Sequence, residues 1–124
     1  SWQAWVGMGA AKSALETLAR YFAVTLAPRG ITVNTISPGW IEDSVLNTLP
    51  DPVVQMIRDH HRNGWTPMRR LGTPADIGNA VTLLCSNEAG WITGQLIAVD
   101  GGMGLMDPAL PLAIQQPELQ AQAV

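Results

Sequence analysis

Lys12 is the residue whose type and position most directly suggest chemistry in this chain. It lies in the segment Gly9-Ala10-Ala11-Lys12-Ser13-Ala14, at the start of an expected helix. A lysine ammonium beside a phenol favours the phenolate and lowers the phenol pKa toward neutrality, as general acid–base catalysis requires. No tyrosine precedes Lys12, and the single tyrosine, Tyr21, follows it by two to three helical turns. Taken by its type and position alone, Lys12 is a solvated lysine on an exposed helix turn, and a role in acid–base chemistry needs an acid from elsewhere in the fold.

Other reactive side chains are weaker candidates. His60 and His61 are adjacent, and neighbours on a helix point about 100° apart, so the two rings cannot share one ligand face. No cysteine or carboxylate cluster beside them completes the spacing of a metal site, so we predict no metal site and expect surface or lid histidines. Cys85 ends an apolar helical stripe, where a core residue is more usual than a nucleophile.

The element that must position Lys12 is a helix over residues 9–27, followed by a strand over 31–36. Apolar side chains recur at helical three- and four-residue spacing along the helix, at Leu15, Leu18, Phe22 and Leu26. Pro28 and Gly30 should end this helix. β-branched residues then favour a buried strand, which Ser37-Pro38-Gly39 should terminate.

Two more helices and a second strand follow. A helix over 52–62 is expected to have Asp51 as its N-cap. Thr73-Pro74-Ala75-Asp76 predicts the start of another helix, with Thr73 as the N-cap. A strand is expected over 95–99. Both strands are apolar, as in parallel sheets covered on both faces, and two strands alone are marginal. The pattern therefore predicts an incomplete α/β sheet.

Composition excludes several classes of protein. The net charge is -3 with seven scattered basic residues, which gives no electrostatic footprint for nucleic acid. One cysteine excludes an internal disulfide and fits a reducing compartment. We find no membrane-length apolar run and no signal peptide, so a cytoplasmic location is expected by default. The chain opens on Ser1, which suggests a fragment or a processed protein.

Three blocks of sequence, in order, resemble the second half of a short-chain dehydrogenase/reductase, nearest to the enoyl- and 3-oxoacyl-acyl-carrier-protein reductases. The blocks are residues 12–34, residues 37–41, and residues 70–77 with 92–95 and 99–102. The resemblance implies the C-terminal part of a doubly wound, Rossmann-like parallel sheet over residues 1–106. Residues 107–124 form a Pro/Gln/Ala-rich tail. The resemblance also implies a missing N-terminal half that carries the glycine-rich dinucleotide loop and the catalytic serine.

The resemblance implies a cofactor site for NAD or NADP. Lys12 would bind the nicotinamide ribose and support acid–base catalysis, Pro38 and Gly39 would line the nicotinamide, and the Ile41 backbone would contact the carboxamide. As a bare tripeptide, Ser37-Pro38-Gly39 is only a strand-ending turn. The family usually has a threonine two residues after this isoleucine, and this chain has Asp43 there.

The catalytic tyrosine of the family has two counterparts here. The common spacing, four residues before the lysine, gives Met8, and the wider spacing of enoyl reductases gives Trp5. The flanking residues resemble the enoyl-reductase branch, so Trp5 is the better counterpart. An indole N–H does not titrate in water and a thioether carries no proton, so neither replaces the phenol.

The resemblance implies part of an NAD(P)-dependent oxidoreductase that transfers hydride to a carbonyl or enoyl thioester, the chemistry of fatty acid biosynthesis. We expect no catalysis by this chain alone. The alternative is a non-catalytic structural or oligomerisation subunit, because helix 9–27 matches a family element that packs against its counterpart in a dimer or tetramer. Trp40 and Trp65 either line an apolar substrate pocket or make packing contacts.

Overall fold

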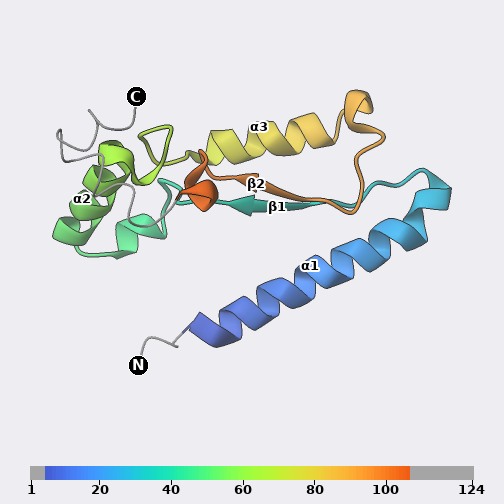
Figure 1. Ribbon diagram of the computed structural model, residues 1–124, viewed down its shortest axis with the longest axis horizontal. Coiled ribbons are helices and arrows are strands. Elements are labelled where there is room, and N and C mark those ends of the chain that lie inside the picture. The colour runs from blue at the N-terminus through green and yellow to red at the C-terminus, as the bar shows by residue number, and fades with distance from the viewer. Residues whose placement is uncertain (1–4, 107–124) are drawn as a thin grey trace, which may run out of the picture. The chain divides into compact units, whose positions relative to one another are not determined.

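The computed structural model describes residues 5–106 and has an α/β arrangement (Figure 1). Its main elements are α1 (Val6–Leu26), β1 (Thr35–Pro38), α2 (Asp51–His60), α3 (Pro74–Leu84) and β2 (Leu96–Val99). The predicted order of helices and strands is thereby confirmed. The predicted tail, 107–124, lies outside the described residues. None of the described helices has the length and apolar character needed to cross a membrane.

Within the described residues, β1 and β2 pair as a two-stranded sheet. The Thr35 N–H donates to the Gln95 carbonyl at 2.8 Å, and the Gly39 N–H donates to the Val99 carbonyl at 3.1 Å. Both bonds join residues at the same offset along the chain, so the strands run parallel. The parallel sheet expected from the apolar strands is confirmed.

The first strand begins at Thr35 rather than at residue 31, and it runs through Pro38. The residues before it are held by side chains as well as by backbone: the Val33 N–H donates to Thr93 Oγ1 at 3.0 Å, and the Gly94 N–H donates to the Val33 carbonyl at 2.7 Å. The Asn34 amide donates to the Ile92 carbonyl at 2.8 Å and accepts from the Gln95 N–H at 3.1 Å. This side-chain clamp sets the register of the strands. Pro38 has no N–H to donate, but the ladder loses no hydrogen bond here, because the donor of the next ladder bond is Gly39.

The prediction that Asp51 caps α2 is wrong. Pro50 is the N-cap, in extended conformation, and no side chain caps this end. The Pro50 carbonyl accepts from the Val53 and Val54 N–H groups at 2.9 and 3.1 Å, so the helix begins one residue earlier than expected. Asp51 lies in the first turn, where its carboxylate is favoured by the helix dipole.

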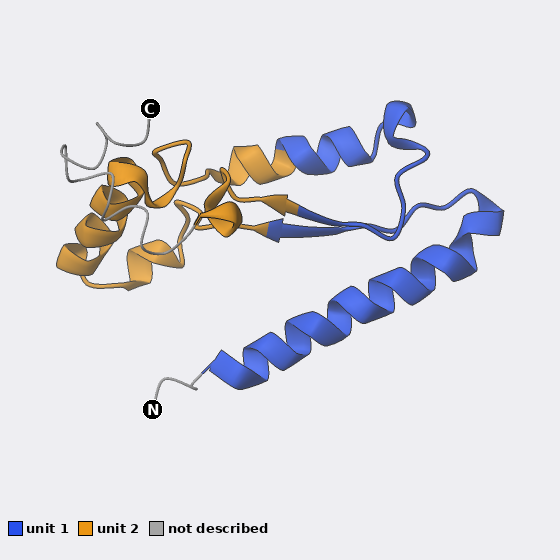
Figure 2. Cartoon of the chain, in the orientation of Figure 1, with its two compact units in different colours: residues 1–37, 79–97 blue, residues 38–78, 98–124 orange. Residues whose placement is uncertain are grey.

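The chain has two compact units, coloured separately in Figure 2: residues 1–37 with 79–97, and residues 38–78 with 98–124. The second unit contains a small core of Leu46, Val54 and Leu71, with Ile57 packed against it. In the first unit, Ala23 of α1 is buried and lies 3.5 Å from the place where a Gly94 Cβ would stand. The predicted apolar stripe of this helix is largely uncovered, with Leu15 57% and Phe22 54% exposed. The described residues therefore leave the apolar face of α1 without cover.

Candidate functional site

The segment after β1 lies close against the end of β2. A Cβ on Gly39 would come within 2.8 Å of the Asp100 Cα, a distance that real side chains do not adopt. Only glycine lets the two backbones approach this closely at the carboxyl ends of the strands. The glycine of the predicted Pro38–Gly39 pair is therefore required by the packing of the sheet itself.

Ile41 forms an isolated parallel bridge with Gly72. The Gly72 N–H donates to the Trp40 carbonyl at 2.9 Å, and the Glu42 N–H donates to the Gly72 carbonyl at 2.8 Å. Successive amides of an extended chain point to opposite edges, so the Ile41 N–H points away from Gly72. By the same alternation it lies on the edge of the Gly39 N–H, which donates to the Val99 carbonyl of β2. The contact of the Ile41 backbone with a carboxamide stays a prediction.

Asp43, which replaces the usual threonine of the family, has a local structural role. Its Oδ1 accepts from the Val45 N–H at 2.9 Å and from the Leu46 N–H at 3.1 Å. The carboxylate thus caps the turn that leads into the short 3₁₀ helix Leu46–Thr48. This brings Leu46 into the small core of the second unit.

Lys12 lies on α1 with its side chain exposed, and it makes no ion pair with the described residues. Met8 precedes it by one helical turn, and Trp5, 70% exposed, is the N-cap of the same helix. Residues four and seven apart share a helical face, so both candidate acid positions lie on the side of Lys12. Lys12 belongs to the first unit, whereas Pro38, Gly39 and Ile41 belong to the second.

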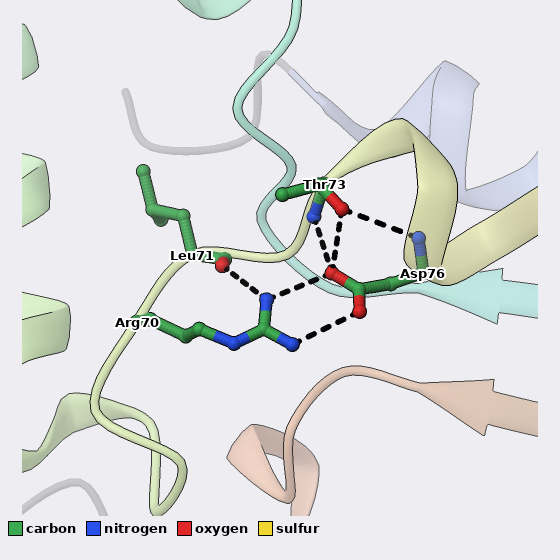
Figure 3. Close-up of polar contacts among 4 residues, drawn as sticks. All are labelled: Arg70, Leu71, Thr73 and Asp76. Carbon is green, nitrogen blue, oxygen red and sulfur yellow. Dashed lines mark hydrogen bonds and ion pairs between the residues drawn. The ribbon is translucent and has the colours of Figure 1, made fainter.

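The start of α3 is fixed by an ion pair and a capping box (Figure 3). Arg70 donates to both carboxylate oxygens of Asp76, at 2.7 and 2.9 Å. Asp76 also accepts from the Thr73 N–H at 2.7 Å, and Thr73 Oγ1 accepts from the Asp76 N–H at 3.2 Å. The predicted Thr73 N-cap is confirmed. Hydrogen bonds from Arg70, and then from Thr73, hold the pKa of Asp76 well below its usual range.

His61 is buried, with 3% exposure, and the expectation of a surface histidine is wrong for this residue. Its Nδ1 is hydrogen-bonded to Thr66 Oγ1, which is equally buried. Gly64, at a φ of 108°, reverses the chain between them. The Trp40 ring lies 6.2 Å from the imidazole at an interplanar angle of 57°. Burial, followed by the nearby His60, lowers the pKa of His61.

This burial predicts a pH-dependent stability. The unfolded chain binds a proton at His61 with an ordinary pKa near 6.5, whereas the folded chain resists protonation. We therefore expect the contribution of His61 to the free energy of unfolding to be constant above pH ~6.5. As the pH decreases from this value to the lowered pKa of the folded chain, the free energy of unfolding should fall. Urea titrations between about pH 7.5 and about pH 5.5 measure this. The fall should shrink in His61→Gln and persist in His60→Gln; equal falls in all three proteins would contradict the assignment.

The structure also places the other residues that the sequence singled out. Cys85 is exposed, so its expected core position is wrong in the described chain. No group of three potential metal ligands occurs among residues 5–106. Trp65 packs edge-on against His60, with ring centroids 5.5 Å apart, while Trp40 lines a cavity described below. Sequence reasoning missed the His61–Thr66 pair, because no local pattern marks a contact across a glycine reversal.

The parallel pair of strands and the helices between them define this chain as part of an α/β protein. The family profile for enoyl-(acyl carrier protein) reductases matches residues 1–104. The chain therefore belongs to the short-chain dehydrogenase/reductase family, and it matches the C-terminal region of that domain.

Relatives of known name support this membership. The chain is 34% identical over 99 residues to tetrahydroxynaphthalene reductase of Pyricularia oryzae, a match that covers 73% of this chain and 35% of that protein. It is 35% identical to a 3-oxoacyl-[acyl-carrier-protein] reductase of Aquifex aeolicus, and this match covers 79% of this chain and 38% of that protein. A solved structure of a putative oxidoreductase from Escherichia coli K-12 aligns with a TM-score of 0.62 at 35% identity, over 80% of this chain and 35% of that one. The chain thus spans about a third of the length of these relatives.

Proposed function

We propose that this chain is the nicotinamide-binding portion of an NAD(P)-dependent oxidoreductase that transfers hydride to a carbonyl or an enoyl thioester. The observation that carries the proposal is the Ile41 N–H, which points away from Gly72 and lies two residues after Gly39, beyond the carboxyl end of β1. The names of the relatives support it, since two of them are reductases and one acts on a 3-oxoacyl group. The family is typically NAD(P)-dependent.

Each candidate residue has a distinct task in this proposal. A bound NAD(P)H supplies the hydride. The Ile41 N–H would donate to the carboxamide of the cofactor, and Pro38 and Gly39 would line the nicotinamide. Lys12, an exposed ammonium, would donate hydrogen bonds to the ribose hydroxyls and lower the pKa of any acid beside it. Neither Trp5 nor Met8 can deliver a proton to the product oxygen.

We expect the chain by itself to be inactive, because the dinucleotide loop and the catalytic serine of the family belong to the N-terminal half. The alternative is a non-catalytic subunit that assembles through α1, and a specific observation favours it: the apolar face of this helix is uncovered by the described residues. Homo-oligomerisation through α1 as a dimer or tetramer, and pairing with a separate N-terminal half, are both compatible with this face.

One experiment distinguishes these functions. The chain is combined with the N-terminal portion of the Aquifex aeolicus relative, and NADPH oxidation is followed with an acetoacetyl thioester. We expect slow turnover by the pair, none by the chain alone, and loss of turnover in Lys12→Ala. No turnover by the pair, together with a stable oligomer of the chain in light scattering, would leave the structural subunit as the function.

A further inference from the structure

A cavity of about 170 Å³ opens at the carboxyl ends of β1 and β2, entirely within the second unit. Its walls include Trp40, Met68, Val99, Gly101, Arg70 and Asp76. Open α/β sheets bind their ligands beyond the carboxyl ends of the strands, which is where Trp40 and Gly101 lie. The position of this cavity is therefore that of a ligand site, although neither Lys12 nor Ile41 lines it.

One side of the cavity is formed by the aromatic ring of Trp40, which lies near the buried His61. Trp40 is 45% exposed, and its ring centroid lies 6.2 Å from that of the buried His61 imidazole. The hydrogen-bonded partner of His61 is Thr66, whose Cγ2 lies 2.7 Å from the place where a Gly101 Cβ would stand. The buried pair thus supports two walls at once, Trp40 directly and Gly101 through Thr66. A rigid, half-exposed indole is a stacking surface for a flat or alicyclic ring.

Another part of the cavity lining, at Arg70, carries hydrogen-bond donors without an excess of positive charge. The Arg70 guanidinium donates to the Leu71 carbonyl and to both oxygens of Asp76, which uses three of its five N–H groups. Its Nε–H and one Nη2–H have no partner among the described residues. Because Asp76 balances the charge, and Asp100 is held by the Gly102 and Gly104 N–H groups, the wall favours a neutral oxygen over an anion.

We propose that this cavity binds a neutral ring compound that bears a carbonyl or hydroxyl oxygen, with the ring against Trp40 and the oxygen at the Arg70 guanidinium. The size agrees, since an apolar cavity of about 150 Å³ accommodates a benzene ring. Met68, an exposed and flexible thioether, adapts the rim to the outline of the ring. Binding here needs no nicotinamide cofactor, so it stands apart from the proposed oxidoreductase function.

Phenol is the probe, and binding to the full chain is followed by saturation-transfer NMR and by the ¹H–¹⁵N signal of Arg70 Nε. We expect a Kd on the order of millimolar, because phenol has few atoms with which to bind. Benzene should leave the Arg70 signal in place, and benzoate should bind more weakly than phenol. Trp40→Ala should weaken phenol binding at least about tenfold, the effect of losing roughly 1.4 kcal/mol of contact.

Matched variants keep the test decisive. Trp65→Ala removes a tryptophan that does not line the cavity, and Arg62→Ala removes an exposed arginine paired with Asp59. Both should bind phenol like the wild type. Met68→Phe fills the cavity from an exposed position and should block binding even if Trp40→Ala fails to fold. An unmoved Arg70 signal at saturating phenol, or unchanged affinity in Met68→Phe, would overturn the proposal.

Discussion

Trp5→Tyr is expected to raise NADPH oxidation by about 10²- to 10⁴-fold when the chain is combined with the N-terminal portion of a relative, the usual contribution of a positioned general acid. Trp5 is the N-cap of α1 and lies on the same helical face as Lys12, two turns away. A phenol at this position comes under the influence of the Lys12 ammonium, which lowers its pKa toward neutrality. The initial rate with an acetoacetyl thioester measures the effect.

Two control variants locate the acid position. Met8→Tyr tests the shorter spacing, in which the phenol lies one turn from Lys12, and Trp5→Phe changes the ring without adding a proton donor. We expect the gain in Trp5→Tyr and no gain in Trp5→Phe. A gain in Met8→Tyr alone would move the acid position to residue 8. No gain in either tyrosine variant would refute a degenerate catalytic site on α1.

Gly39→Ala is expected to lower the free energy of unfolding by about 1–3 kcal/mol, the usual cost of forcing an extra carbon into a packed site. The added Cβ would meet the Asp100 Cα at 2.8 Å, and backbone cannot turn aside as a flexible side chain can. Relief requires β1 and β2 to separate at their carboxyl ends, which would also lengthen the bond from the Gly39 N–H to Val99. Urea unfolding followed by circular dichroism measures the change.

Gly78→Ala is the matched control for this substitution. Gly78 lies in α3 of the same unit, and a Cβ there has nothing within 4 Å. Alanine is the better helix former by about 1 kcal/mol, so this variant should be unchanged or more stable. If Gly39→Ala were as stable as Gly78→Ala, the close approach of the two strands would be refuted.

Local signals in the sequence predicted much of this fold. The Thr73-Pro74-Ala75-Asp76 pattern gave the start of α3 and its capping box, because the groups involved lie within one helical turn. Apolar spacing predicted α1, and the apolar character of both strands predicted their parallel pairing. The start of β1 was misplaced, because the register depends on Asn34 and Thr93, which are about sixty residues apart along the chain.

The site was less predictable for the same physical reason. Resemblance supplied Lys12, Pro38, Gly39 and Ile41, but the direction of the Ile41 N–H, away from Gly72, depends on its bridge to that residue. His61 was expected at the surface, and a contact with Thr66 across the Gly64 reversal buries it. Cys85 was expected in a core that the described residues do not build around it.

Binding of NADPH to the combined protein is the measurement that tests the central claim most directly. Isothermal titration should give saturable binding, and Lys12→Ala should weaken it about 10- to 100-fold, the value of charge-assisted hydrogen bonds worth roughly 1.5–3 kcal/mol. Arg62→Ala, which removes an exposed charge of the same sign, should bind as the wild type does. Absence of NADPH binding to a folded pair, or equal affinity in Lys12→Ala, would contradict the assignment of this chain as a nicotinamide-binding portion.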